Sequence, residues 1–308
     1  MTDLKGRRLL SVSDLSRAEV FAFLEKAKQL RMSAKQGNDL LSGRILGLLF
    51  EMASTRTRAS FEAAMMQLGG EVIYMRPDEL QLGRGEPIKD TARVLTEYLD
   101  ALVLRTNKHE TSEKFADYCD IPVINGLSDL EHPTQILCDL YTIQEAKNQL
   151  EGLNLAWIGD GNNVCNSWLL GACMMGMNIS VATPKGYEPD RDILKKAMEI
   201  ADESGSEIDL MKEPEEAVRN ADILYTDVWI SMGQEEEAER RMGAFQGYQI
   251  NRDLLKNAKR DAIVMHCLPA HRGMEITEDI LEGRRSIVWK QAENKLHGAK
   301  AILALVTN

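Results

Sequence analysis

The sequence lacks the marks of a secreted, membrane-spanning or nucleic-acid-binding protein. Its N-terminal stretch, "MTDLKGRRLLSVSDLSRAEV", has no apolar core of signal-peptide length. No run of about 18 apolar residues, the length needed to span a bilayer, occurs anywhere. Lys and Arg number 37 against 48 Asp and Glu, and the net charge of −11 repels a phosphate backbone. We therefore expect no membrane and no nucleic-acid partner, and any bound anion must be held by a local basic cluster.

Paired cysteines are also missing. The five cysteines are an odd number and no two of them form a CxxC, so free thiols in a reducing cytoplasm are expected. Cys267 lies between two histidines in "VMHCLPAHRG", but one thiol without a second pair is not typical of a zinc site. We expect no metal. A cysteine followed by Leu268 and Pro269 is better suited to present a thiol and a backbone carbonyl to a substrate.

A dinucleotide-binding fingerprint is incomplete. Gly159 and Gly161 in "WIGDGNNVCNS" begin a GxGxxG pattern, but its third position is Val164. The next expected strand, "ISVATP", does not end in an acidic residue. We therefore expect no nucleotide cofactor, and Asn162 and Asn163 are instead interpreted as polar groups aimed at a small ligand.

Short apolar runs alternate with helical patterns along the 308 residues, a length that predicts two domains of roughly 150 residues each. Ser16 and Glu19 fit a capping box at the start of a first helix. Strands are expected at "RILGLLF", "EVIYM", "ALVLR" and "IPVI", and, after "KNQLEGLN", at "LNLAWIG", "NISVAT", "EIDLM", "DILYTDV" and "AIVMHCL". Helices are expected near 87–98, 110–118, 134–147, 163–175, 190–204, 214–220 and 251–258, with a last one over 292–303. This alternation predicts an α/β fold with two doubly wound parallel sheets, whose ligands bind beyond the carboxyl ends of the strands.

The segment "STRTR" (54–58) follows the expected strand "RILGLLF" and begins a helix. A helix N-terminus offers free N–H groups, the hydroxyls of Ser54, Thr55 and Thr57 add donors, and Arg56 adds a planar fork that suits phosphate oxygens. The alternative is a helix cap with solvated arginines, although a cap needs only one hydroxyl. The pattern favours a phosphate site.

Two further strand ends carry polar residues. Arg105 ends "ALVLR", and His132 and Gln135 in "HPTQ" lie about one helical turn apart after "IPVING". If they share a sheet edge with Arg56, the group describes a pocket for a small phosphorylated compound that also carries a carbonyl.

In the second half, "LYTDVWISMGQEEE" places Asp227 at a strand end, followed by Ser231, Met232 and Gly233. A carboxylate at a strand end suits an ammonium group, and the alternative is a helix-capping Asp. The small residues predict a loop that can move.

The motifs "STRTR", "LGRGEPIKDTARVL", "HPTQILCDL", "DGNN", "DVWISMG" and "HCLPAHRG" occur in the order seen in ornithine carbamoyltransferases, which the chain resembles from about residue 5 to its C-terminus. The resemblance implies two α/β domains joined by interdomain helices. The carbamoyl phosphate-binding domain would be 1–148 completed by the helix 290–308, and the ornithine-binding domain 149–289. It also implies a cytoplasmic homotrimer, sometimes assembled further, without metal or organic cofactor. The implied reaction carbamoylates the δ-amine of L-ornithine, giving L-citrulline and phosphate in arginine biosynthesis.

The resemblance also assigns site residues. For carbamoyl phosphate they are Ser54, Thr55, Arg56, Thr57, Gln81, Arg105, His132, Gln135, Cys267, Leu268 and Lys295; for ornithine they are Asn163, Asp227, Ser231 and Met232. The catalytic residues would be Arg56, Arg105, His132 and Cys267, and Gln81 would reach into a neighbouring subunit's site. The family usually has "ENR" where this chain has Glu293-Asn294-Lys295, and Lys keeps the charge but lacks the bidentate fork. The alternatives are a carbamoyltransferase for putrescine, aspartate or another amine, and a non-catalytic binding relative.

Overall fold

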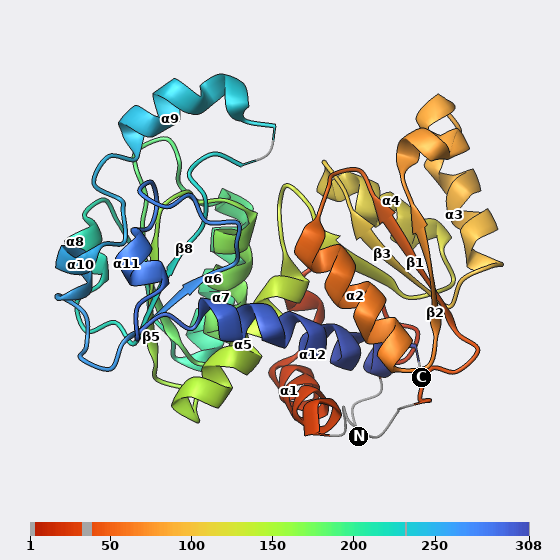
Figure 1. Ribbon diagram of the computed structural model, residues 1–308, viewed down its shortest axis with the longest axis horizontal. Helices are drawn as coiled ribbons and strands as arrows, with labels where there is room; N and C mark the ends of the chain where they lie inside the picture. The colour runs from red at the N-terminus through yellow and green to blue at the C-terminus, as the bar shows by residue number, and fades with distance from the viewer. Residues whose placement is uncertain (1–3, 33–38, 232, 308) are drawn as a thin grey trace. The chain divides into compact units, whose positions relative to one another are not determined.

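The computed structural model describes residues 4–32, 39–231 and 233–307. The chain folds into two compact units, one of Met1–Tyr141 with Glu293–Asn308 and one of Thr142–Ala292. Each unit has its own parallel sheet (Figure 1). Among the described residues, no helix combines the length and apolar character needed to cross a membrane.

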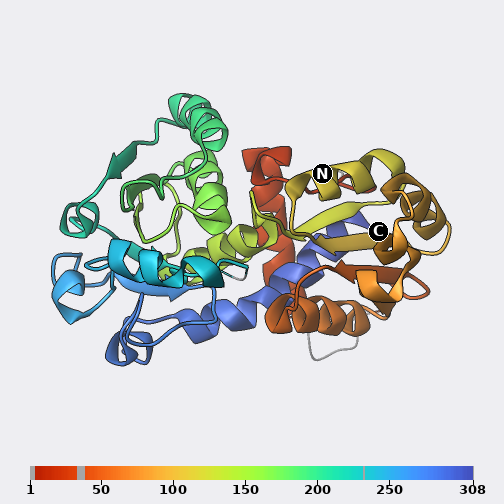
Figure 2. The ribbon, with the colours of Figure 1, turned by 90° about the horizontal axis from the view of Figure 1, so that it is seen from above.

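The first unit has a four-stranded parallel sheet. Its elements are η1 (Val12–Asp14), α1 (Arg17–Met32), β1 (Ile45–Phe50), α2 (Thr55–Gln67), β2 (Glu71–Met75), η2 (Pro77–Glu79), η3 (Gln81–Arg84), α3 (Ile88–Thr96), β3 (Ala101–Arg105), α4 (His109–Tyr118) and β4 (Val123–Leu127). Two long helices are divided between the units: α5 (Pro133–Lys147) belongs to the first unit up to Tyr141, and α12 (Val288–Val306) belongs to it from Glu293 onward. The strand order is β2-β1-β3-β4. Strands β1 and β3 are buried apolar runs, as expected where helices cover both faces of a parallel sheet; Figure 2 shows α2 and α4 on opposite faces.

The second unit has a five-stranded parallel sheet in the order β7-β6-β5-β8-β9. Its elements are β5 (Asn154–Ile158), α6 (Asn163–Met174), β6 (Asn178–Ala182), α7 (Arg191–Ser204), β7 (Ile208–Met211), α8 (Pro214–Ala217), β8 (Ile223–Thr226), η4 (Glu235–Glu237), α9 (Ala238–Ala244), α10 (Arg252–Leu255), β9 (Ile263–His266) and α11 (Glu278–Leu281). The rings of Trp157 and Tyr225 stack in its core with centroids 5.3 Å apart. The prediction of two parallel-sheet α/β domains is thus confirmed.

Local sequence signals account for several boundaries. The predicted capping box is present at α1, where Glu19 Oε2 accepts from Ser16 N over 2.7 Å and Ser16 Oγ accepts from Glu19 N over 3.3 Å. The helices predicted over 214–220 and 251–258 are shorter than expected, because α8 and α10 each span four residues. Helices α9 and α11 were not predicted, since so few residues carry too little periodicity to be recognised.

Both sheets contain a topological switch point. In the first sheet the chain leaves β1 toward β2 on one side and continues to β3 on the other, and in the second sheet β5 and β8 stand in the same relation. Ligands of doubly wound sheets bind in the crevice at the carboxyl ends of such strands. The loops after β1 and β3, and those after β5 and β8, are therefore the places for functional side chains.

Candidate active site

The N-terminus of α2 directly follows the switch-point strand β1. Ser54 is the N-cap residue with an extended backbone (φ −152°, ψ 113°), yet its hydroxyl makes no capping hydrogen bond. The first turn of α2 contains no acidic residue, and Thr57 is buried. The capping alternative therefore does not account for the Ser54 hydroxyl, and this turn presents N–H donors, a hydroxyl and the half-buried Arg56 without a competing anion.

Arg58, the second arginine of "STRTR", is engaged elsewhere. Its Nε donates to Glu62 Oε1 over 2.8 Å, one turn along α2. Its guanidinium also lies 3.5 Å from the centroid of the Tyr74 ring on β2, a cation–π contact. One arginine of the motif therefore stabilises the helix and its contact with the sheet, which leaves Arg56 for a ligand.

Arg105 ends β3 next to the strand that leads into α2. In the register of the parallel pair it lies opposite Phe50, the last residue of β1, and its carbonyl accepts from Glu51 N over 2.8 Å. Its side chain is buried, with 7% exposed. The sheet itself thus places a buried guanidinium beside the loop that begins α2.

His132 completes a cluster of charged groups in this unit. It immediately precedes α5 and is buried. Burial, followed by the positive charges of Lys295, Arg105 and Arg56, holds the pKa of His132 well below its usual value. The imidazole is therefore neutral at pH 7, and three cations lie close enough to oppose its protonation. Cations gathered in this way around a buried imidazole are typical of an anion site.

Lys295 and Gln135 are joined directly. Lys295 Nζ on α12 donates to Gln135 Oε1 on α5 over 2.5 Å, and Gln135 Nε2 donates to Asp139 Oδ1 over 2.8 Å. All three side chains are buried. The structure thus brings Arg56, Thr57, Arg105, His132, Gln135 and Lys295 to one region of the first unit. Gln81 has an exposed side chain in η3, on the segment between β2 and α3, and is not shown to join them.

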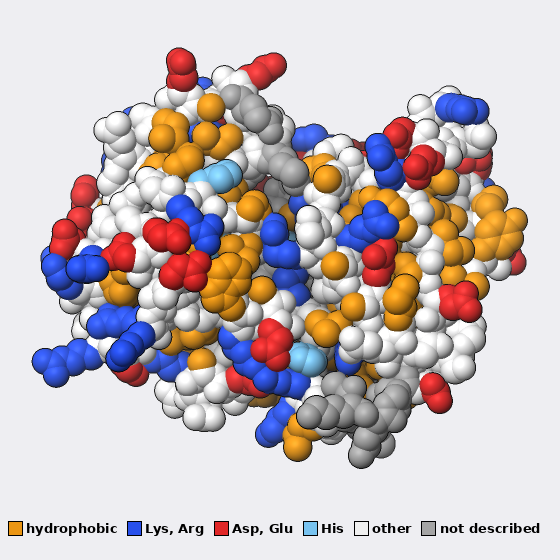
Figure 3. Space-filling model, in the orientation of Figure 1, with side chains coloured by type: hydrophobic (Ala, Val, Ile, Leu, Met, Phe, Trp, Pro, Cys, Tyr) orange, Lys and Arg blue, Asp and Glu red, His pale blue; other side chains and the backbone are white. Residues whose placement is uncertain are grey.

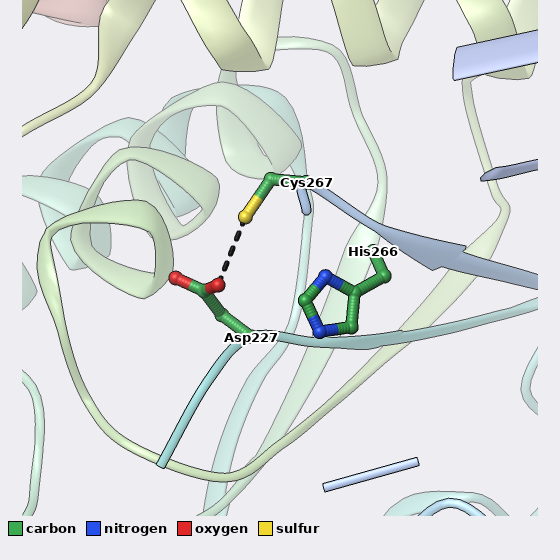
Figure 4. Close-up of side chains that lie close together, drawn as sticks. All are labelled: Asp227, His266 and Cys267. Carbon is green, nitrogen blue, oxygen red and sulfur yellow. Dashed lines mark hydrogen bonds between the residues drawn. The ribbon is translucent and has the colours of Figure 1, made fainter. Parts of the chain in front are cut away.

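Asp227 follows β8 at the switch point of the second sheet. Its Oδ1 accepts from Cys267 Sγ over 3.0 Å (Figure 4) and from Val228 N over 2.8 Å, and its Oδ2 accepts from Asn162 Nδ2 over 2.8 Å. A carboxylate has about four acceptor positions, so these three donors leave one. Asp227 caps no helix, and this arrangement suits a carboxylate that receives an ammonium group.

Asp227, His266 and Cys267 lie close enough together to raise the question of a metal ion, with ligand atoms within 4.8 Å of one another (Figure 4). Both nitrogens of His266 are engaged, however. Nδ1 accepts from Leu268 N over 2.8 Å, and Nε2 lies 3.1 Å from Glu275 Oε1. An imidazole with both nitrogens engaged in hydrogen bonds has no nitrogen left for a metal ion, so the group does not fit a metal site.

Two other residues predicted for ornithine, Asn163 and Ser231, follow strands β5 and β8 of the same sheet. Asn162 is the N-cap of α6, accepting from Val164 N and Cys165 N, and Asn163 is the first residue of that helix. Ser231 N donates to Gln234 Oε1 over 3.0 Å in the loop after β8. Met232 lies outside the described residues. The sequence predicts that Asn162 faces a ligand, but its contact with Asp227 spans 65 positions and depends on the fold.

One ion pair near this edge was not predicted. Arg241 on α9 donates to Asp160 Oδ2 over 2.9 Å and to Trp229 O over 3.0 Å, and its guanidinium lies 4.9 Å from the Tyr187 ring centroid. Burial raises the pKa of Asp160 to about 6, although Arg241 opposes the shift. Asp160 belongs to the quoted "DGNN", but its partner is 81 positions away on a short helix that the sequence does not reveal.

Together the fold and the site define an α/β protein with two doubly wound units, one carrying a buried cation cluster and the other a carboxylate suited to an amine. The chain belongs to the aspartate/ornithine carbamoyltransferase family. The family's carbamoyl-P binding domain matches residues 7–145, and its Asp/Orn binding domain matches residues 151–306.

Individual relatives are similar over their whole length. An ornithine carbamoyltransferase of Nostoc punctiforme is 54% identical over 306 residues, 99% of each chain. A protein named anabolic ornithine carbamoyltransferase from Pyrococcus furiosus is 49% identical over 308 residues, covering 99% of this chain and 98% of that protein. The solved structure of ornithine carbamoyltransferase from Pyrococcus furiosus superposes with a TM-score of 0.96 at 48% identity, covering 100% of this chain and 99% of the other.

Proposed function

We propose that this protein transfers the carbamoyl group of carbamoyl phosphate to the δ-amine of L-ornithine, giving L-citrulline and phosphate. The observation that carries the proposal is full-length similarity, at about half of all positions, to proteins named ornithine carbamoyltransferase. One of these is named anabolic, which supports a role in arginine biosynthesis.

Carbamoyl phosphate would bind to the first unit. Arg56 and Arg105 are suited to the phosphate oxygens, because a guanidinium fork matches their geometry. Thr57 and the neutral His132 are suited to the carbamoyl oxygen, which accepts hydrogen bonds as it gains negative charge. The side-chain amide of Gln135, which is hydrogen-bonded to Lys295 and Asp139, is suited to the carbamoyl amine. The family resemblance adds Ser54, Thr55, Lys295, Gln81, Cys267 and Leu268 to these contacts.

Ornithine would bind to the second unit through its α-ammonium at Asp227. Aspartate as acceptor has no side-chain ammonium and would need basic residues where this chain has Asp227 and "SMG". Putrescine has no α-carboxylate, so that loop would have little to bind. The resemblance places Asn163, Ser231 and Met232 at the ornithine as well.

The chemistry requires a neutral δ-amine to attack the carbamoyl carbon. A C–N bond forms, the bond from the carbamoyl carbon to the phosphate oxygen breaks, and the leaving phosphate accepts the proton, so the atoms balance without a cofactor. Fixed donors at Arg56, Arg105, Thr57 and His132 would stabilise the negative charge that develops on the carbamoyl oxygen and on the oxygen of the leaving phosphate. Cys267, whose thiol donates a hydrogen bond to Asp227, would orient the δ-amine.

A single assay tests this function. Purified protein is incubated with carbamoyl phosphate and ornithine, aspartate or putrescine in parallel, and each carbamoylated product is measured. We expect citrulline to form at least about a hundredfold faster than the other products, because aspartate lacks the side-chain amine and putrescine lacks the α-carboxylate, so either acceptor would leave polar groups of the site unpaired. A faster reaction with another acceptor would reassign the substrate, and no product with any acceptor would favour a non-catalytic binding protein.

We also propose a homotrimer, in the cytoplasm, that could assemble further. The support for association is a set of large hydrophobic side chains exposed on the first unit: Met66 on α2, Ile73 on β2, Val94 on α3 and Tyr98 just after α3. Figure 3 shows part of this hydrophobic surface beside α3. Where such side chains form a contiguous patch, the patch marks a protein–protein contact. Sedimentation measurements would test the trimer, and a monomer would contradict it.

A further inference from the structure

Helices α5 and α12 contact each other at two successive turns within the first unit. Gln135 and Cys138 are three residues apart on α5, and Lys295 and Gly298 are three residues apart on α12, so each pair shares one helix face. At the first turn, Lys295 Nζ donates to Gln135 Oε1 over 2.5 Å. At the second turn, a Cβ added to Gly298 would lie only 2.2 Å from Cys138 Sγ and 3.3 Å from Cys138 Cβ. The polar contact and the close approach therefore belong to one interface.

Gly298 is not explained by its backbone conformation. It lies inside α12, a 19-residue helix, and its φ is not positive. A glycine inside a helix costs about 1 kcal/mol relative to alanine. The lack of space beside Cys138 explains why glycine is present, because a Cβ at position 298 would require Cys138 Sγ to move or the two helices to separate.

Cys138 contributes volume rather than reactivity. Its side chain is buried, and burial raises the pKa of its thiol to about 12, so the thiol is neutral at pH 7. A neutral, buried thiol behaves as a small hydrophobic group. Cys138 and Gly298 together therefore act as a spacer of fixed size between α5 and α12.

The spacing fixes the Gln135 amide. Lys295 can only donate, so the Gln135 oxygen must face Lys295, and the amide nitrogen then donates to Asp139 Oδ1 over 2.8 Å. Both ends of the amide are held by buried charged partners. A small displacement of α12 would lengthen the first of these contacts and release the amide.

The same spacing affects His132. The charged groups that oppose its protonation are Lys295 from α12, Arg105 from β3 and Arg56 from α2, and Thr134 Oγ1 lies 3.4 Å from its Nδ1. Burial is the largest cause of its low pKa, and Lys295 is the next. Moving the ammonium of Lys295 away would therefore raise the pKa of His132.

We propose that Gly298 and Cys138 are positioning residues for carbamoyl phosphate, because their close contact sets the depth at which Lys295 reaches Gln135 and His132. This inference rests on the proposed function and adds two residues that act through Lys295. It predicts that space at position 298, rather than the identity of either residue, is what the site requires.

A double-substitution cycle tests this requirement. Gly298→Ala should raise the KM for carbamoyl phosphate on the order of tenfold or more while changing the KM for ornithine far less, since sub-ångström misplacement of a binding group is costly. Cys138→Ala removes the clashing Sγ, so the double variant Gly298→Ala/Cys138→Ala should return to the KM of Cys138→Ala. Gly243→Ala on α9 is the matched control: an added Cβ meets no atom within 4 Å, and the KM for carbamoyl phosphate should not change.

A second measurement does not depend on activity. The five histidines can be followed by NMR without substrate, and loss of one resonance in His132→Gln identifies His132. We expect the pKa of His132 to rise in Gly298→Ala and in Lys295→Met. In Gly298→Ala/Cys138→Ala it should return to the value found in Cys138→Ala. A purely structural role would lower the active fraction without moving this titration.

The outcomes separate this inference from the proposed function. A parent protein that forms no citrulline but shows the histidine shifts would contradict the function and keep the contact. A Gly298→Ala protein with parental KM and parental His132 titration overturns the inference. If Gly298→Ala does not fold, the double variant decides: a KM equal to that of Cys138→Ala supports the spacer, and a KM raised above it overturns the inference.

Discussion

At the scale of single residues, the first unit separates an arginine that can meet a ligand from one that is already engaged. Arg56 and Arg58 are two positions apart, but Arg58 contacts Glu62 and Tyr74, whereas Arg56 joins Arg105 in opposing the protonation of His132. The sequence alone gives no means of telling the two arginines apart. Their different surroundings provide a matched pair of substitutions.

We expect Arg56→Ala and Arg105→Ala each to lower kcat/KM about a hundredfold, corresponding to about 3 kcal/mol, because each removes a fixed positive charge from the leaving phosphate. Arg58→Ala removes the same type of side chain from the same motif and should stay within about threefold of the parent. Steady-state kinetics with both substrates checks this. Equal losses in all three variants would mean that the motif matters for folding rather than for the anion.

Asp227 offers a second test at this scale, because three of its four acceptor positions already have donors within the second unit. Asp227→Asn should raise the KM for ornithine by roughly 30-fold, since it removes the charge from a hydrogen bond to an ammonium worth about 2 kcal/mol. The KM for carbamoyl phosphate should move much less. A parallel rise in both KM values would show that Asp227 supports the loop instead of the amine.

At the scale of secondary structure, α9 depends on one buried ion pair. Arg241 joins this short helix to Asp160 after β5 and to the backbone of Trp229 after β8. Burial raises the pKa of Asp160 from 3.8 to about 6. A carboxyl group whose folded-state pKa is raised stabilises the fold at low pH, and this contribution is lost as the pH rises through the folded-state pKa.

The Asp160→Asn protein lacks this titration. Between pH 4 and pH 7 the difference in unfolding free energy should therefore shift in favour of the variant by about 2 kcal/mol. Asp253→Asn is the control, because the hydrogen bond from Lys256 lowers the pKa of exposed Asp253, and its contribution is lost only as the pH falls below about 3.8, so little shift is expected in this range. Denaturant titrations at both pH values measure the shifts. A constant Asp160→Asn difference across this range would contradict the raised pKa.

Elements with strong local signals could be predicted from the sequence. The capping box of Ser16 and Glu19 gave the start of α1, and continuous apolar runs gave β1 and β3 because strands buried on both faces do not alternate. The topological rule for doubly wound sheets then pointed to the strand ends, where the structure has Arg105 and Asp227. These features are local or follow from chain order alone.

Features that depend on distant contacts could not be predicted. Lys295 meets Gln135 across 160 positions, and Arg241 meets Asp160 across 81. The low pKa of His132 likewise depends on charges from three other elements. A sequence pattern reports spacing along the chain, whereas packing brings these side chains together. Their partners could therefore be identified only from the three-dimensional structure.

At the scale of the whole molecule, the proposed trimer would share its sites between subunits. Gln81 is exposed in η3, whereas neighbouring Leu80 and Leu82 pack against the core of their own unit. Deleting the segment 77–86 would therefore damage the unit itself, but substituting Gln81 alone should not. This difference makes Gln81→Ala the suitable variant for testing whether one chain completes the site of the next.

We expect Gln81→Ala and Arg105→Ala trimers each to have little activity, and mixed trimers to recover part of it. After unfolding and refolding in equal amounts, a site is intact when its own chain carries the Gln81 substitution and its donor chain carries the Arg105 substitution. Each condition holds for half of the chains, so about a quarter of the parental activity should return in a cyclic trimer with random mixing. Mass measurement must first establish that the trimers are mixed. Activity no higher than the mean of the two unmixed variants would mean that each subunit builds its site alone, and Gln81 would then be removed from the proposed site.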